Sequence, residues 1–193
     1  MKVHDFFTGN APDLDGLARH LDALDNETRI EQARALSAKE QAQLFDAAAG
    51  KHALTLDDFV PAAVPPLREV IHQGRNSLAA FKIFQKRFCR PEGKSDELYG
   101  YNEQTMRFAT GPGYFIARDA GKGEVVIDYH DVPDRKPEGW PKILPNSARL
   151  SRFVYYRTRD YMRGVSKHVS IGRAMRDEKM MDNWFVLCRD ERV

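Results

Sequence analysis

Apolar residues recur with a helical period through the first quarter of the chain. Leucines follow one another at intervals of three and four residues, at Leu14, Leu17, Leu21 and Leu24. This spacing places one apolar stripe along a helix. A second short helix is expected over residues 25–37, with Asp25 or Asn26 as its N-cap.

The clearest local signal for a helix lies in residues 37–50. Ser37 and Glu40 have the spacing of a capping box, and strong helix formers follow them. Gly50 suits the left-handed residue that ends many helices. This segment therefore predicts a third helix with defined ends.

Prolines interrupt the next segment and divide it into short pieces. Pro66 suits the first turn of a helix that runs through Ile71 and His72 and ends near Gly74. Residues 76–91 fit a helical stripe as well as a strand, and their density of aromatic residues favours the strand.

The second half of the chain changes to strands joined by turns. Arms that begin at Tyr114 and Glu124 flank a glycine-rich turn at residues 120–123, which predicts a β-hairpin. Residues 133–148 are rich in proline and are expected to form an ordered surface loop. Residues 183–189 predict a final strand.

Helices therefore crowd residues 1–75, and strands dominate residues 76–193. This order is typical of the α+β class rather than of alternating α/β folds. Sequential strands with short turns pair antiparallel. We expect N-terminal helices packed on a curved antiparallel β-sheet or partly closed β-barrel, with the mainly helical segment and the β-rich segment forming one structural unit.

Length and composition narrow the class of protein. The 193 residues suffice for one domain with a substantial core. Apolar residues make up 42% and charged residues 30%, which fits a soluble globular protein. No window approaches the ~20 apolar residues of a membrane helix, and the first residues lack the apolar core of a secretory signal. We expect a cytoplasmic protein with no membrane span.

Two pairs of residues are candidates for covalent or metal chemistry. Cys89 and Cys188 lie far apart among apolar neighbours, so we expect both thiols to be free and buried. Asp128 and His130 would share a strand face and could begin a metal site, but the spacing suggests no third ligand. The sequence therefore predicts neither a disulfide nor a metal site, and it names no cofactor.

The charge is uneven although the net charge is only +2. Residues 1–58 hold six basic and eleven acidic residues, whereas residues 149–176 hold eight basic residues and one acid, Asp160. Such a basic patch can attract an anionic partner, or the acidic N-terminal part can pack beside it. Composition does not distinguish the two.

Residues 149–157 interleave arginines with aromatic and branched side chains, and we expect them to form a strand. Because successive side chains of a strand point to opposite faces, Arg152 would share a face with Val154 and Tyr156. A guanidinium among apolar neighbours needs a carboxylate, phosphate or similar acceptor. The pattern predicts an anion site, with an internal ion pair or an arginine head that reaches water as the alternatives.

Residues 165–173 extend this pattern. As a strand, they would place His168 between Ser166 and Ser170, where an imidazole that titrates near neutral pH could line a cavity. If the opposite face forms the core, His168 is exposed instead. Tyr161, Val165 and Val169 also fit a helix, in which case the alternation does not apply. Serine near histidine suggests nucleophilic catalysis, but no GxSxG elbow is present.

Three functional hypotheses follow. The first is a small-molecule binding protein whose curved sheet encloses a partly apolar pocket for an anionic or amphipathic ligand. Its expected polar contacts are Arg152, Tyr156 and His168, with Tyr114 and Trp140 as walls or lid. The second is RNA or single-stranded DNA binding through residues 149–176, against which the modest sequence pI of 8.5 counts. The third is an enzyme that uses His168 as general acid or base.

Overall fold

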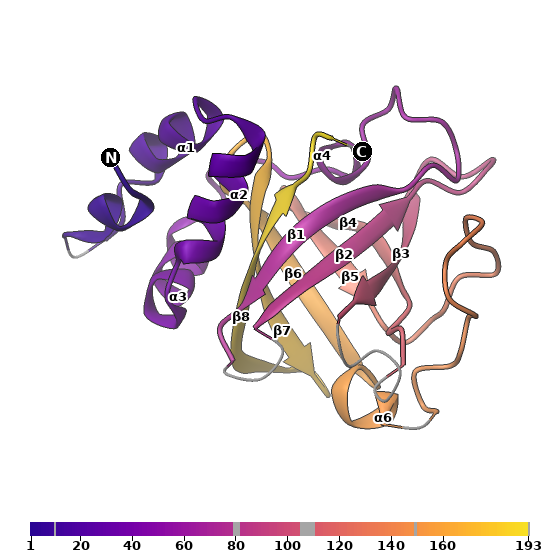
Figure 1. Cartoon of the computed structure of the whole chain (residues 1–193). Coiled ribbons are helices and arrows are strands. Elements are labelled where there is room, and N and C mark those ends of the chain that lie inside the picture. The colour runs from indigo at the N-terminus through magenta and orange to yellow at the C-terminus, as the bar shows by residue number, and fades with distance from the viewer. Residues whose placement is uncertain (10, 79–81, 105–110, 149, 193) are drawn as a thin grey trace.

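The computed structural model describes residues 1–9, 11–78, 82–104, 111–148 and 150–192. The N-terminal part of the chain is helical, and the remainder builds a β-barrel (Figure 1). Both termini of the described chain lie at the surface of this arrangement, the N-terminus on the helical side (Figure 1).

Short helices make up the N-terminal part. They are the 3-10 helix η1 (Val3–Phe7) and the α-helices α1 (Leu14–Asp22), α2 (Asn26–Ala35), α3 (Ala38–Ala47) and α4 (Leu56–Phe59). The Asp25 carboxylate accepts from the Thr28 backbone N–H, and Ser37 with Glu40 forms the reciprocal capping box, which confirms both expected caps. Within the described residues, no helix combines the length and apolarity needed to cross a bilayer.

Eight antiparallel strands close into a barrel, because each strand pairs with its neighbours in sequence and the last pairs with the first. They are β1 (Val70–Asn76), β2 (Ile83–Cys89), β3 (Glu97–Glu103), β4 (Phe115–Gly121), β5 (Glu124–Asp128), β6 (Thr158–Gly164), β7 (Val169–Arg176) and β8 (Lys179–Arg189). A short helix, α6 (Ser151–Val154), precedes β6. The expected α+β class is confirmed, and the barrel is fully closed.

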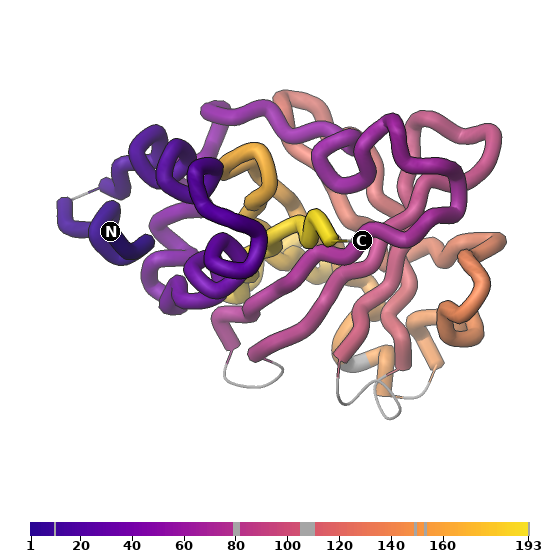
Figure 2. Tube along the Cα trace, turned by 45° about the horizontal axis from the view of Figure 1, so that its top comes forward, coloured from indigo at the N-terminus to yellow at the C-terminus, as the bar shows by residue number. Residues whose placement is uncertain are grey.

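The helices cover one outer side of the barrel, as Figure 2 shows from a second direction. Val169 and Ile171 of β7 and Val186 of β8 point outward into an apolar cluster with Leu21 and Leu44 of the helices. The N-terminal helices therefore pack on the outer face of β7 and β8 through this apolar cluster.

Alternate residues of the same strands point inward and fill much of the barrel. The buried inner cluster includes Val70, Phe88, Leu98, Phe115, Ile127, Met162 and Leu187. Phe59 of α4 joins this cluster, with its ring centroid 5.0 Å from that of Phe88. The helix α4 lies at one end of the barrel (Figure 1), and its Phe59 packs there against the inner cluster.

The expectation of a helix from Pro66 to Gly74 is wrong. Val70–Asn76 forms β1, which pairs with β2 on one side and β8 on the other. Closing the barrel gives the backbone of this segment hydrogen-bond partners along both edges. That tertiary gain exceeds the local preference for a helical turn at Pro66, which is worth much less.

The expectation of a strand over residues 149–157 is also wrong. The Tyr155 N–H donates to the Ser151 carbonyl at 2.8 Å, which closes the turn of α6, while Arg149 lies outside the described residues. Arg157 follows with a positive φ of 61° and redirects the chain into β6. The alternation that placed Arg152 on an apolar strand face therefore does not exist, and this side chain is exposed.

The expected strand over residues 165–173 is only partly right, because β7 begins at Val169. Residues 166–168 form a turn closed by backbone hydrogen bonds between Ser166 and Val169, so Ser166 and His168 do not lie on a strand face.

The remaining local expectations are confirmed. Residues 76–91 contain β2, the predicted hairpin is β4 and β5, and residues 183–189 belong to β8. Cys89 and Cys188 are free and buried, and burial raises the pKa of each thiol to about 12. At neutral pH both cysteines are therefore protonated core residues.

Candidate functional site

One end of the barrel interior holds a cavity of about 280 Å³. Aromatic rings form much of its wall, at Phe84, Tyr129, Tyr155 and Phe185. Polar side chains lie around its outer end, at Asn76, Gln104, Thr158, Arg176 and Asn183. Leu78 at this end is exposed and Arg176 is half-buried, so the cavity reaches the surface of the protein.

Three glycines make room for the phenylalanine rings of the interior. In the strand register the facing pairs are Gly74 with Phe84, Gly100 with Phe115, and Gly172 with Phe185. A Cβ atom added to these glycines would lie 2.7, 2.3 and 2.4 Å, respectively, from the facing ring. Each ring therefore lies across the neighbouring strand at a position where only a hydrogen atom fits.

A buried lysine lies at the inner end of the cavity. Lys86 Nζ donates to Asn102 Oδ1 at 3.0 Å, to Asp160 Oδ2 at 3.1 Å and to the Tyr129 hydroxyl. The Tyr129 hydroxyl donates in turn to Asp160 Oδ2 at 3.1 Å and accepts from Asn102 Nδ2 at 3.1 Å. All four side chains are buried, and we call them the Lys86 network.

Aromatic rings surround the ammonium group. The distances from Lys86 Nζ to the ring centroids are 5.9 Å for Phe84, 5.0 Å for Phe115, 5.1 Å for Tyr129 and 5.0 Å for Phe185. Contacts of this kind attract a cation to the face of a ring. Three of the four rings are the ones that the glycines admit, so the glycines and the lysine belong to one arrangement.

The pKa values of Lys86 and Tyr129 in this network shift in opposite directions. Desolvation lowers the pKa of Lys86, and the neighbouring Asp160 carboxylate partly offsets that effect. Burial, together with Asp160, raises the pKa of Tyr129 well above its ordinary value, so the phenol stays protonated. The network therefore holds a lysine whose neutral form is more accessible than that of a solvated lysine.

Arg176 brings a positive charge to the outer end of the cavity. Its Nη2 donates to the Val154 carbonyl at 2.8 Å, and its Nε lies 3.4 Å from the Thr158 hydroxyl. Across the cavity, Gln104 donates to the Tyr155 hydroxyl at 3.0 Å. Among the described lining residues, the charged ones are Lys86, Asp160 and Arg176.

Sequence reasoning missed the inner residues of this site. Phe84, Lys86 and Phe88 alternate along β2 and share its inner face, so a lysine stands between two aromatic residues on a core face. That pattern was available in the sequence, but it becomes visible only after residues 76–91 are assigned to a strand. The partner Asp160 comes from β6, far along the chain, and no local signal connects it to Lys86.

The structure brings Tyr114 and Trp140 together, but on the outside of the barrel. Their ring centroids are 6.3 Å apart, and both rings pack against Tyr101. Trp140 Nε1 donates to a Glu69 carboxylate oxygen at 2.5 Å, and the Tyr114 hydroxyl donates to the Pro141 carbonyl. These contacts fasten the loop of residues 133–148 to the sheet.

Arg152 and Tyr156 come from the segment that supplies one side of the cavity. Arg152 belongs to α6, Tyr156 follows it, and both side chains are exposed. Their neighbours Val154 and Tyr155 line the cavity. None of the five residues predicted to contact a ligand is itself among the described lining residues.

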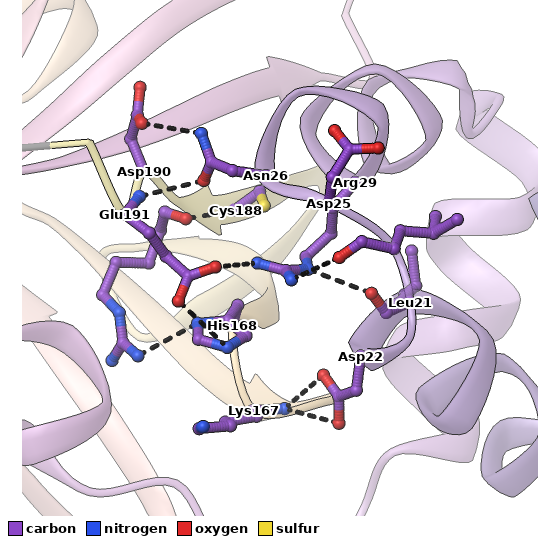
Figure 3. Close-up of polar contacts among 12 residues, drawn as sticks. Leu21, Asp22, Asp25, Asn26, Arg29, Lys167, His168, Cys188, Asp190 and Glu191 are labelled. Carbon is purple, nitrogen blue, oxygen red and sulfur yellow. Dashed lines mark hydrogen bonds and ion pairs between the residues drawn. The ribbon is translucent and has the colours of Figure 1, made fainter.

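His168 lies outside the barrel, where the end of β8 meets the helices (Figure 3). Its Nδ1 accepts from Arg189 Nη2 at 3.0 Å, and its Nε2 lies 3.6 Å from Glu191 Oε1. Glu191 also accepts from Arg29 Nη1 of α2 at 2.6 Å. Burial, with the nearby Arg29 and Arg189 charges, lowers the pKa of His168, so its imidazole is neutral near pH 7.

Four arginines of the basic stretch of residues 149–176 form ion pairs with acidic residues of the β-rich part of the chain. The pairs are Arg157 with Asp177, Arg159 with Asp128, Arg163 with Glu124, and Arg173 with Asp182, at 2.6 to 3.2 Å. The acids come from the β-rich part of the chain, not from the acidic N-terminal part. These arginines are therefore partly neutralised by neighbouring strands and turns.

No protein-family model matches this chain, and no curated protein or solved structure matches it. The fold and the cavity define the class: a closed eight-stranded antiparallel β-barrel with a helical cover on one side. Barrels of eight strands are just wide enough to be filled by side chains or to hold one small ligand. The buried aromatic interior of this barrel is compatible with small-molecule binding.

Proposed function

We propose that this protein binds a small, partly apolar anion in the barrel cavity. The observation that carries the proposal is a cavity of about 280 Å³ with aromatic walls and with Arg176 at its outer end. Ligand sites are typically concave and mostly apolar, with a few polar groups that orient the ligand. This combination distinguishes the cavity from a packing defect, which would be smaller and lined by apolar atoms alone.

The volume limits the size of the ligand. Pockets for drug-sized molecules run from ~300 to ~1,000 Å³, so this cavity lies near the lower limit. A single aromatic or branched aliphatic group with one charged substituent fits that space. The rings of Phe84, Tyr155 and Phe185 provide apolar contact for the body of such a ligand.

The charges favour a ligand that is anionic at its outer end. At the inner end, the charges of Lys86 and Asp160 compensate each other across 3.1 Å. Arg176 brings a permanent positive charge near the surface, which attracts a carboxylate or phosphate. Arg152 and Tyr156, next to the lining residues of α6, are proposed to contact the solvent-facing end of the ligand.

The first test is the mass of the protein purified gently from cells, measured under native and denaturing conditions. An adduct that is lost on denaturation would give the mass of the ligand. Titration calorimetry with 4-methylbenzoate, a small aromatic carboxylate, then tests the ligand class directly.

A pair of alanine variants locates the binding site. Ala174 lines the cavity, and Ala174→Leu would place added methyl groups in the space for the ligand. Ala120 is exposed on β4, so Ala120→Leu is the matched control. We expect Ala174→Leu to weaken binding at least about tenfold, a change of roughly 1.4 kcal/mol, and Ala120→Leu to leave it unchanged. Equal affinity in both variants would place the ligand elsewhere.

Nucleic-acid binding through residues 149–176 and acid–base chemistry at His168 stay predictions. Measuring affinity at several salt concentrations distinguishes nucleic-acid binding from the cavity proposal. Nucleic-acid binding neutralises several phosphates, so its affinity falls steeply as the salt concentration rises. Binding of one carboxylate at Arg176 would depend on salt much less.

A further inference from the structure

Lys86 differs from every other lysine of this protein. All lysines fall within the described residues, and Lys86 is the one that is buried. Burying an ammonium group is costly unless the group is paired and fully hydrogen-bonded. A neutral side chain of the same volume would fill the barrel without this cost, so the presence of an amine at the inner end of a cavity calls for a chemical explanation.

We propose that Lys86 forms a reversible protonated imine with an aldehyde or ketone carbonyl that reaches the inner end of the cavity. This proposal rests on the proposed function, because the carbonyl compound has to enter the same cavity. The imine narrows the class of ligand to a small apolar molecule with a carbonyl group at its inner end and an anionic group at its outer end.

The proton acceptor that the reaction requires is in contact with the amine. Lys86 must lose a proton before its nitrogen can attack a carbonyl carbon, and Asp160 Oδ2 lies 3.1 Å from Nζ. Proton transfer within this pair gives a neutral amine and a neutral carboxylic acid. Burial favours that neutral pair, because water is excluded from both charges.

The same groups complete the reaction with atoms and charge in balance. The lone pair of Nζ forms the C–N bond, and the carbonyl oxygen takes the proton that Asp160 received. The resulting carbinolamine loses its hydroxyl group as water, using one further proton from the nitrogen by way of Asp160. In total, one ammonium and one carbonyl give one protonated imine and one water.

The protonated imine keeps the interactions that stabilise Lys86. Its positive charge stays beside the Asp160 carboxylate and among the rings of Phe115, Tyr129 and Phe185. The buried ion pair is therefore preserved in both states, and the reaction does not leave an uncompensated charge in the barrel. Tyr129 and Asn102, which contact Nζ, are placed to hydrogen-bond the oxygen that leaves.

The test uses 4-formylbenzoate as the probe and sodium cyanoborohydride as the trap, with 4-methylbenzoate as a ligand of similar shape that has no carbonyl group. Peptide mapping by mass spectrometry then reports the carboxybenzyl group on each lysine. We expect Lys86 to be labelled at least about tenfold faster than the exposed Lys122 and Lys179. These exposed lysines serve as controls within the same molecule, so no substitution of Lys86 is needed.

The alanine variants show whether labelling requires the cavity. Ala174→Leu should slow labelling of Lys86 at least about tenfold, whereas Ala120→Leu and the exposed lysines should keep their rates. An excess of 4-methylbenzoate should slow labelling of Lys86 alone.

The outcomes separate the two proposals. If 4-methylbenzoate binds but Lys86 is labelled no faster than exposed lysines, the imine proposal is overturned and the binding function stands. If neither aromatic acid binds and Lys86 is not labelled, both the ligand class and the imine are overturned.

Discussion

Two polar clusters among the described residues connect distant parts of the chain, but they differ in the free space beside them. The Lys86 network joins β2, β3 and β6 at the inner end of a cavity of about 280 Å³. The second cluster joins α2 to the end of β8 through Arg29, His168 and Glu191 (Figure 3), and we call it the junction cluster.

The junction cluster has the residue types of an active site without the room for a substrate. The cavity beside His168 measures about 10 Å³, which is about the space of one water molecule. Arg29 also donates to the carbonyls of Leu21 and Leu24, so its guanidinium is used to fasten α2 to the preceding turn. Shifted pKa values and close charges therefore mark a candidate site only where a ligand can enter.

The largest effect is expected from breaking the Lys86 network. Lys86→Met would leave Asp160 buried without its cation, which typically costs about 3–5 kcal/mol of unfolding free energy. Urea unfolding measures this loss. Adding Asp160→Leu should recover most of it, because the second substitution removes the unpaired charge. A loss below about 1 kcal/mol for Lys86→Met would show that Asp160 reaches water.

The next effect concerns the glycines that admit the rings around Lys86. A Cβ at position 100 would lie 2.3 Å from the Phe115 ring and 2.6 Å from the Arg87 carbonyl oxygen. Because a backbone atom cannot move aside easily, Gly100→Ala should cost about 3 kcal/mol by overpacking. Gly9→Ala is the matched control, since its Cβ would make only an ordinary contact at 3.5 Å. Similar unfolding free energies for the two variants would contradict the packing argument.

The third effect is a loss of stability in acid from buried histidines. Burial lowers the pKa of His72 to about 3 in the folded protein, from an ordinary value of 6.5, and the nearby Arg189 and His168 act in the same direction. The unfolded chain therefore binds the proton more readily, and the stabilising contribution is fully present above pH 6.5 and is lost as the pH falls toward 3.

Between pH 7 and pH 5, His72 alone should cost about 2 kcal/mol of unfolding free energy. Urea unfolding at the two pH values measures the slope. His72→Leu should remove this part of the pH dependence, whatever it does to stability at pH 7. An unchanged slope in that variant would mean that other groups cause the acid sensitivity.

The smallest effect is expected at the junction cluster. The Glu191 side chain is 43% exposed, so its ion pair with Arg29 is weakened by solvent. Glu191→Gln keeps the shape and should cost about 1 kcal/mol or less. Urea unfolding compares this loss of unfolding free energy with that of Lys86→Met. Equal losses for the two variants would contradict the difference proposed between the two clusters.

Local patterns in the sequence predicted the helix caps, the β4–β5 hairpin and the α+β class, because each depends on residues close together in the chain. They failed at β1 and at α6, where the partners or the path of the chain come from elsewhere. The predicted contacts Tyr114 and Trp140 do lie together, but parity along a strand does not say which face points into a barrel. The sequence shows Lys86 between two phenylalanines on one face of a strand. The rings of Phe115, Tyr129 and Phe185 come to surround its ammonium group only when the sheet closes into a barrel.

Local patterns in the chain were sufficient to place α1, α2, α3 and the β4–β5 hairpin, since capping groups, glycines and alternating side chains act within a few residues. What the strands enclose depends on long-range pairing. Closure of β1 against β8 turns one face of every strand inward, and this sets Lys86 beside Asp160 across a separation of many residues. Burial and charge pairing are properties of that enclosed volume, so the cavity and its chemistry appear only when the barrel is complete.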